Sequence, residues 1–218
     1  MRTNFNFTLM LSLTLSMLIS TSYASGSNNA VCQEKGDKIW CGQGTVDHVD
    51  YLDDLVFNGT TIIGNTKVIG DVDASHTHFN TVDITGDFKG DNSDIKGSAK
   101  IVGDFKFDHV VFHQDTSITG DMRAQDAHLL GRSKIVGDIT CESCQFSNNL
   151  TLSSFTADMA NCKISNIDFT PTTKQQTLYL KNSIVNGNIT FSSNHGTVYL
   201  SEGSTISGAV KGGIVINQ

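Results

Sequence analysis

The sequence predicts an all-β chain wound as a single-domain parallel β-helix, or β-solenoid, with coils of about 17 residues. The first observation is a regular recurrence of the pair Gly-Asp. It occurs at Gly70-Asp71, Gly86-Asp87, Gly103-Asp104, Gly120-Asp121 and Gly137-Asp138. The second is that apolar and polar residues alternate within each repeat, as in Phe105-Lys106-Phe107, which is strand patterning. A short repeat made of strands indicates one coil stacked on copies of itself, and crossover handedness favours a right-handed coil.

Composition and charge agree with this fold class and exclude some functions. The 218 residues include 20 glycines and one proline, which suits short strands joined by tight glycine turns. The formal net charge of −7 argues against binding to nucleic acid or to anionic membrane surfaces, because both require a basic protein surface.

Residues 1–24 have the pattern of a secretory signal peptide. Arg2 supplies the positive start, an apolar stretch runs from Leu9 to Ile19, and Ser22-Tyr23-Ala24 forms a small-x-small cleavage site. The mature chain is expected to begin at Ser25. Since the apolar stretch is short and rich in hydroxyl groups, we expect no membrane span. The predicted location is therefore outside the cytoplasm, either periplasmic or secreted.

Residues 25–54 precede the repeats and are predicted to cap one end of the stack. An open stack exposes unpaired strand edges that invite other chains, so a cap is useful there. The segment holds Cys32, Trp40 and Cys41, followed by an acidic run at Asp47, Asp50, Asp53 and Asp54.

Residues 55–218 form the predicted solenoid of about nine coils. Aligning the repeats on Gly-Asp produces inward apolar columns. They are Val72, Phe88, Phe105, Met122 and Ile139; Phe79, Ile95, Phe112, Leu129 and Phe146; and Ile84, Ile101, Ile118, Ile135 and Leu152. The last strand, with Ile214, Val215 and Ile216, has no evident cap and is predicted to be an assembly edge, so a homo-oligomer through the C-terminal coil is a candidate state.

Five cysteines fit an oxidising compartment. We predict structural disulfides Cys32–Cys41 and Cys144–Cys162, because the second pair falls on adjacent coils, with Cys141 left free. The rival pair is Cys141–Cys144. These two cysteines also spell C-x-x-C, but redox catalysis is disfavoured because both lie on inward columns rather than at a helix N-terminus.

The recurring Gly-Asp pairs can be interpreted in two ways. A row of aspartates on successive coils would suit a cation such as calcium, whereas turn chemistry would use the glycine for positive φ and the aspartate to bond the backbone. Turn chemistry is favoured, since Lys89, Lys106 and Arg123 lie close by to neutralise the row. The histidines His76, His78, His109, His113 and His128 are interpreted as surface residues, since those that share a column are too far apart for one metal ion.

The sequence contains no recognised catalytic motif, and neither an enzyme activity nor a cofactor is predicted. The coil connections are also short for the long loops that carry active sites in sugar-processing β-helices. Tyr179 and Tyr199 lie on neighbouring late coils and leave carbohydrate binding or processing as an alternative.

The runs Lys67–Val72, Ile101–Phe105 and Ile135–Ile139 resemble the coil signature of bactofilins, which are bacterial polymer-forming proteins with a small triangular right-handed β-helix. The resemblance extends roughly from Leu55 to Leu152. It implies end-to-end assembly through apolar terminal coils, without a nucleotide. The chain departs from that family in its export signal and its cysteines, and it lacks the family's polar tails.

Together these observations predict a non-catalytic, exported structural or adhesive protein of a bacterial cell envelope or secretome. Its expected partners are a second copy of the chain, a cell surface, a glycan or a host protein. A secreted virulence factor that uses the rod as a scaffold remains a further alternative.

Overall fold

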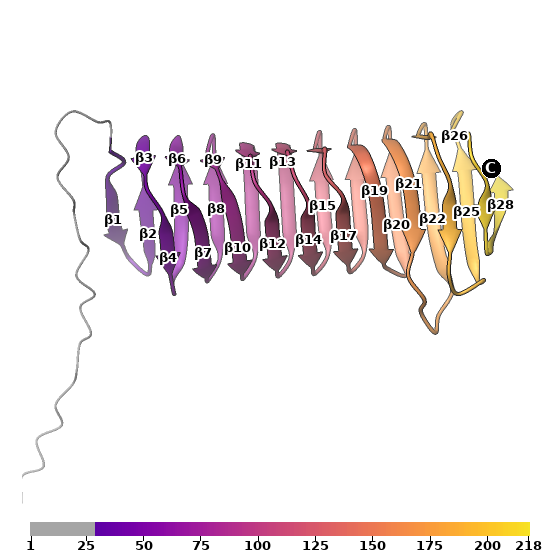
Figure 1. The fold of residues 1–218 in the computed structure, drawn as a ribbon, viewed down its shortest axis with the longest axis horizontal. Coiled ribbons are helices and arrows are strands. Elements are labelled where there is room, and N and C mark those ends of the chain that lie inside the picture. The colour runs from indigo at the N-terminus through magenta and orange to yellow at the C-terminus, as the bar shows by residue number, and fades with distance from the viewer. Residues whose placement is uncertain (1–28) are drawn as a thin grey trace, which may run out of the picture.

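The computed structural model describes residues 29–218, which form one straight rod of stacked β-coils (Figure 1). The predicted signal peptide, with its cleavage site at Ser22–Ala24, lies outside the described residues, as do the first residues of the predicted cap. All regular structure in the described part is β-strand, numbered β1 to β28, and the coil-to-coil pairings are parallel. The predicted fold class is confirmed.

Each coil contributes a strand to three sides of the rod, here called faces A, B and C. Face A stacks β2 (Lys38–Cys41), β5 (Asp54–Asn58), β8 (Val72–Ser75), the first parts of β11 (Phe88–Ile95) and β13 (Phe105–Phe112), β15 (Met122–Gln125), β18 (Ile139–Glu142), β20 (Thr156–Ala160), β22 (Gln176–Lys181), β25 (Gly196–Ser201) and β28 (Gly213–Asn217).

Faces B and C complete the coils. Face B stacks β3 (Gly44–Val46), β6 (Thr60–Ile62), β9 (His78–Phe79), the second parts of β11 and β13, β16 (His128–Leu129), the first parts of β19 (Gln145–Ser153) and β21 (Lys163–Phe169), β23 (Ile184–Val185) and β26 (Thr205–Ile206). Face C stacks β4 (Val49–Tyr51), β7 (Asn65–Ile69), β10 (Thr81–Thr85), β12 (Ala99–Val102), β14 (Thr116–Thr119), β17 (Ser133–Val136), the ends of β19 and β21, β24 (Ile189–Phe191) and β27 (Val210–Lys211).

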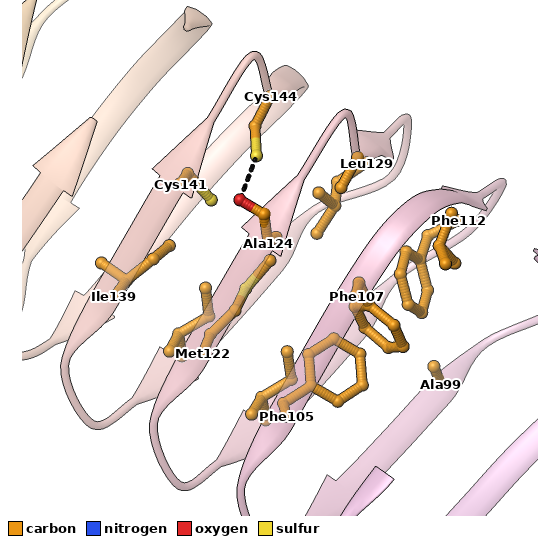
Figure 2. Close-up of a cluster of buried hydrophobic side chains, with 14 of the residues drawn as sticks. Ala99, Phe105, Phe107, Phe112, Met122, Ala124, Leu129, Ile139, Cys141 and Cys144 are labelled. Atoms are coloured by element: carbon orange, nitrogen blue, oxygen red, sulfur yellow. Dashed lines mark hydrogen bonds between the residues drawn. The ribbon is translucent and has the colours of Figure 1, made fainter. Parts of the chain in front are cut away.

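The predicted inward columns are the core of the rod. Strand register places Phe88 beside Phe105 and Phe105 beside Met122, and the other two columns align in the same way. Every member of the three columns is at most 2% exposed. Figure 2 shows such side chains from successive coils filling the interior together. The alternation along each strand buries one side chain and exposes the next, as a two-residue period requires.

The solenoid begins earlier than predicted and has about 11 coils rather than nine. Strands β2, β3 and β4 already form a coil, because they pair in parallel with β5, β6 and β7. The predicted boundary at residue 55 is therefore wrong. Residues 38–53 carry no Gly-Asp pair, and Trp40, Cys41 and the acidic run within them were interpreted as features of a cap. The cap is smaller than predicted and consists of β1 (Cys32–Lys35) paired antiparallel with β2, together with the short stretch that precedes it.

Glycine is required where successive coils approach most closely. Gly103 has φ +152°, a value that side chains rarely adopt, and a Cβ atom on it would lie 2.2 Å from the carbonyl oxygen of Gly86 on the preceding coil. The same close approach recurs at Gly86, Gly120 and Gly137. The glycine of each Gly-Asp pair therefore sets how tightly the coils stack.

Replacing Ile118 by Asp should unfold the rod. Ile118 is fully buried between Ile101 and Ile135, and an unpaired charge there costs about 3–5 kcal/mol, a large part of the stability of a typical domain. Circular dichroism during denaturant unfolding measures the loss. The control is Thr119→Asp, one residue further along the same strand and exposed, which should unfold like the parent. Equal stability of Ile118→Asp and the parent would refute the assigned inward columns.

Candidate functional site

The C-terminal end of the rod presents the predicted assembly edge. Strand β28 pairs with β25 alone among the described strands, so its other edge is open. Val215 occupies the inward position directly beside Val198, yet it is 43% exposed whereas Val198 is fully buried. On the outward side Ile214 and Ile216 are 61% and 36% exposed. The end of the core is thus an apolar surface bordered by unpaired backbone groups.

The N-terminal end is closed differently. Strand β1 lies on β2, and a disulfide joins Cys32 to Cys41 across the pair, as predicted. Strand β1 carries Gln33, Glu34 and Lys35, so the outermost strand at this end is polar and charged. A short, charged edge strand discourages pairing with another chain, so the face A edge at this end is less open to pairing than that of β28, although Val31 and Trp40 beside it are 63% and 42% exposed.

The Gly-Asp pairs occupy the corner between faces C and A, where the aspartates form a continuous hydrogen-bonded ladder. One carboxylate oxygen of each aspartate accepts the backbone N–H of the next ladder aspartate, one coil further on, at 2.8 to 3.0 Å. The ladder runs from Asp54 through Asp71, Asp87, Asp104 and Asp121 to Asp138. The aspartates therefore bond the backbone at the corners, as the favoured interpretation expected. Each carboxylate bonds the corner of the next coil rather than its own corner. Beside the ladder, Lys89 pairs with Asp73 at 3.7 Å, and Lys106 and Arg123 follow it in register.

Cys141, Cys144 and Cys162 are buried free thiols, so the predicted bridge Cys144–Cys162 is not formed in this structure. The two residues do lie on adjacent coils, since the backbone N–H of Lys163 bonds the carbonyl oxygen of Cys144. Adjacency alone does not make a bridge, because a disulfide also requires a specific orientation of the two Cβ–Sγ bonds. Instead, the Cys144 thiol lies 3.6 Å from the carbonyl oxygen of Ala124 (Figure 2). The rival pair Cys141–Cys144 is also unbridged.

The environment of these thiols suppresses their reactivity. Burial raises the pKa of Cys141. The pKa of Cys144 is raised by its hydrogen bond with Cys141 and by burial, and that of Cys162 by its hydrogen bond with Cys144 and by burial. Because the thiolate is the nucleophile in thiol–disulfide exchange, this C-x-x-C is poorly suited to redox catalysis.

Tyr179 and Tyr199 stack on each other along face A. Their ring centroids are 5.0 Å apart and their planes differ by 10°. A sugar would stack on a ring face, and here each ring covers one face of the other. The pair is accordingly a packing contact between coils, which weakens the carbohydrate alternative.

His76, His78, His109 and His128 lie at or near the corner between faces A and B, in the predicted columns, whereas His113 follows the end of β13 at the corner between faces B and C. Three of them have acidic partners that sequence reasoning missed. His113 and His78 lie 2.6 Å and 3.8 Å from carboxylate oxygens of Asp94. Nδ1 of His109 lies 2.6 Å from Oδ1 of Asp108, and Nε2 of the same ring lies 3.5 Å from Oδ2 of Asp126 on the next coil. Sequence reasoning compared histidines only with other histidines and so missed this group, because its other members are acidic: Asp126 in the same row on the next coil, and Asp108 in the adjacent row.

Comparisons with known proteins give no assignment: no protein-family model, curated protein or solved structure matches the chain. Among residues 29–218, no helix is long and apolar enough to cross a membrane.

Replacing Asp104 by Ala should destabilise the rod by about 1 kcal/mol, because the backbone N–H of Asp121 loses its acceptor. Asp104→Asn is the matched control, since an amide oxygen can accept the same bond. The structure uses asparagine in this way at another corner, where Asn166 accepts the backbone N–H of Asn188. Urea unfolding of both variants tests the ladder. The Asn variant should keep most of the stability of the parent. Equal losses in the Asn and Ala variants would mean that carboxylate charge, not hydrogen bonding, matters at this corner.

The three free thiols should resist labelling in the folded protein and react once it unfolds. Counting thiols with a chromogenic disulfide reagent at pH 8 should give no fast reaction in buffer and three thiols in denaturant without reductant, with Cys32–Cys41 retained. A count of one in denaturant would show that two of the three are bridged, as first predicted.

Stability should also fall as the pH rises past about 8.5, the usual pKa of an exposed thiol. The folded chain holds the pKa of these thiols higher, so above that pH the unfolded chain binds fewer protons and is favoured. Cys144→Ala, which installs the residue found at the same position on the preceding coil, Ala127, should weaken this dependence.

Proposed function

We propose that the chain is a non-catalytic, exported structural or adhesive rod that associates through its C-terminal end. The observation that carries this proposal is the contrast between the two ends. On face A, one end carries a disulfide-bonded, charged hairpin, and the other exposes Ile214, Val215 and Ile216 beside an unpaired strand edge. Nothing on the sides of the rod combines apolar exposure with open backbone groups in this way.

Export is supported by the signal pattern in residues 1–24 and by the Cys32–Cys41 disulfide, a bond typical of oxidising compartments. A structural role is supported by the arrangement of the sides of the rod. Successive coils repeat similar residues in rows, as with Lys89, Lys106 and Arg123. Rows of like groups such as these do not supply the unlike, converging groups that catalysis requires.

A second copy of the chain is the partner that fits the C-terminal end. Residues 196–218 carry only two charged side chains of opposite sign, Glu202 and Lys211, so two such ends can meet without charge repulsion. Contact would cover the exposed Val215 and pair the open edge of β28. The end-to-end association implied by the bactofilin resemblance is of the same kind.

Light scattering of residues 25–218 across a concentration series tests the proposal. The mass should rise toward two or more chains, and Val215→Lys should hold it at one, because a charge would enter the contact. Ile184→Lys is the control: it replaces an exposed apolar residue on a side of the rod and should associate like the parent. A parent mass of one chain at every concentration, or association of Val215→Lys, would disprove the role of this end.

A further inference from the structure

The corner between faces A and B holds one group of unlike ligating atoms. Asp108 ends the face A part of β13, His109 follows it at the corner, and Asp126 lies directly beside His109 on the next coil. One ligand atom from each residue falls within 4.8 Å of the other two. Of the residues described, only these three histidine, cysteine or acidic side chains meet in such a group.

The backbone of the corner holds these side chains in place. His109 and Asp126 both have positive φ, at 54° and 48°. The coil that follows fixes this arrangement, because the backbone N–H of Asp126 bonds the carbonyl oxygen of Glu142 at 2.9 Å. The positions that flank the group in the same row are Asn92 and Ser143, so no further charge of that row lies next to it.

A second observation concerns the carboxylate of Asp108. Its Oδ1 atom is shielded from solvent and has no hydrogen-bond partner, although Nδ1 of His109 is only 2.6 Å away. The two atoms are close, but they lack the direction that an N–H donor needs. The Asp108 side chain as a whole is 51% exposed, but a shielded carboxylate oxygen without a hydrogen bond is costly, and a cation bound to that oxygen would remove the cost.

From this geometry we propose that Asp108, His109 and Asp126 bind a divalent transition-metal ion, with water in the remaining positions. One imidazole nitrogen and two carboxylates form a mixed N/O donor set, which suits Zn²⁺ or Mn²⁺ better than the all-oxygen set preferred by Ca²⁺. The two carboxylates balance the charge of the ion. Acidic side chains in the adjacent row, Asp91 and Glu142, add negative potential around it.

The role of such an ion follows from where its ligands lie. Asp108 and His109 belong to one coil and Asp126 to the next, so the ion links two coils on the outside of the rod. This inference is independent of association at the C-terminal end, because the site is on the side of the rod and several coils away from β28.

Titration calorimetry with Zn²⁺ on metal-stripped protein without an affinity tag tests the site. We expect binding of a single ion per chain. His109→Asn and Asp126→Asn should each weaken it at least about tenfold, the scale seen even for the loss of outer-shell partners. Both substitutions preserve the backbone, because asparagine occupies the same corner row at Asn92 and Asn161 with positive φ.

His128→Gln is the matched control. His128 is an exposed histidine on the neighbouring face, and Gln145 occupies the equivalent position on the next coil. This variant should bind Zn²⁺ like the parent. The proposal is overturned if the parent shows no heat of binding at 100-fold excess Zn²⁺, if His109→Asn binds as tightly as the parent, or if His128→Gln loses affinity to the same extent. Circular dichroism of every variant confirms that the rod is folded.

Discussion

Parallel stacking in register is the constraint on which the rest of this structure depends. A coil of about 17 residues cannot enclose a core alone, so each inward side chain is buried by the coils on either side, about 4.8 Å away. Ile118 is fully buried because Ile101 and Ile135 stand at the same position on those coils. The same spacing brings the Gly103 backbone so close to Gly86 that no side chain fits between them. Core, corner and ladder are consequences of one repeat distance.

Stacking also creates a problem that only the ends can solve. Every inner coil is covered on both sides, but a terminal coil exposes one layer of core and one set of strand edges. At the first coil, the polar strand β1 covers the face A edge, and the Cys32–Cys41 disulfide holds it there. At the last, Val215 occupies a core position with a core residue on one side only. In the proposed association, the second chain would cover this exposed layer as one more coil would.

The interior could be predicted from sequence because inward positions are strictly apolar and the Gly-Asp pairs supply the register. The start of the solenoid could not, since residues 38–53 form a coil without that pair. The Cys144–Cys162 bridge was predicted only because the two residues lie on adjacent coils, and they do. The bridge is nevertheless absent, since the direction of a side chain depends on backbone geometry that residue spacing does not reveal. The group around His109 was missed for a related reason. Its members come from two neighbouring rows, and two of them lie at a corner with positive φ, so no single row of the sequence alignment contains the group.

The sides of the rod show how chemistry can arise on a repetitive surface. Where a row keeps its residue type, like groups recur at a fixed distance, and the ladder aspartates tolerate this because each carboxylate accepts a backbone N–H. Where a row changes type, unlike groups become neighbours. The change from His109 to Asp126 between adjacent coils is such a place, and the solvent-shielded oxygen of Asp108 lies beside it. In a solenoid of this kind, breaks in the rows rather than the repeats themselves are therefore where binding is to be sought.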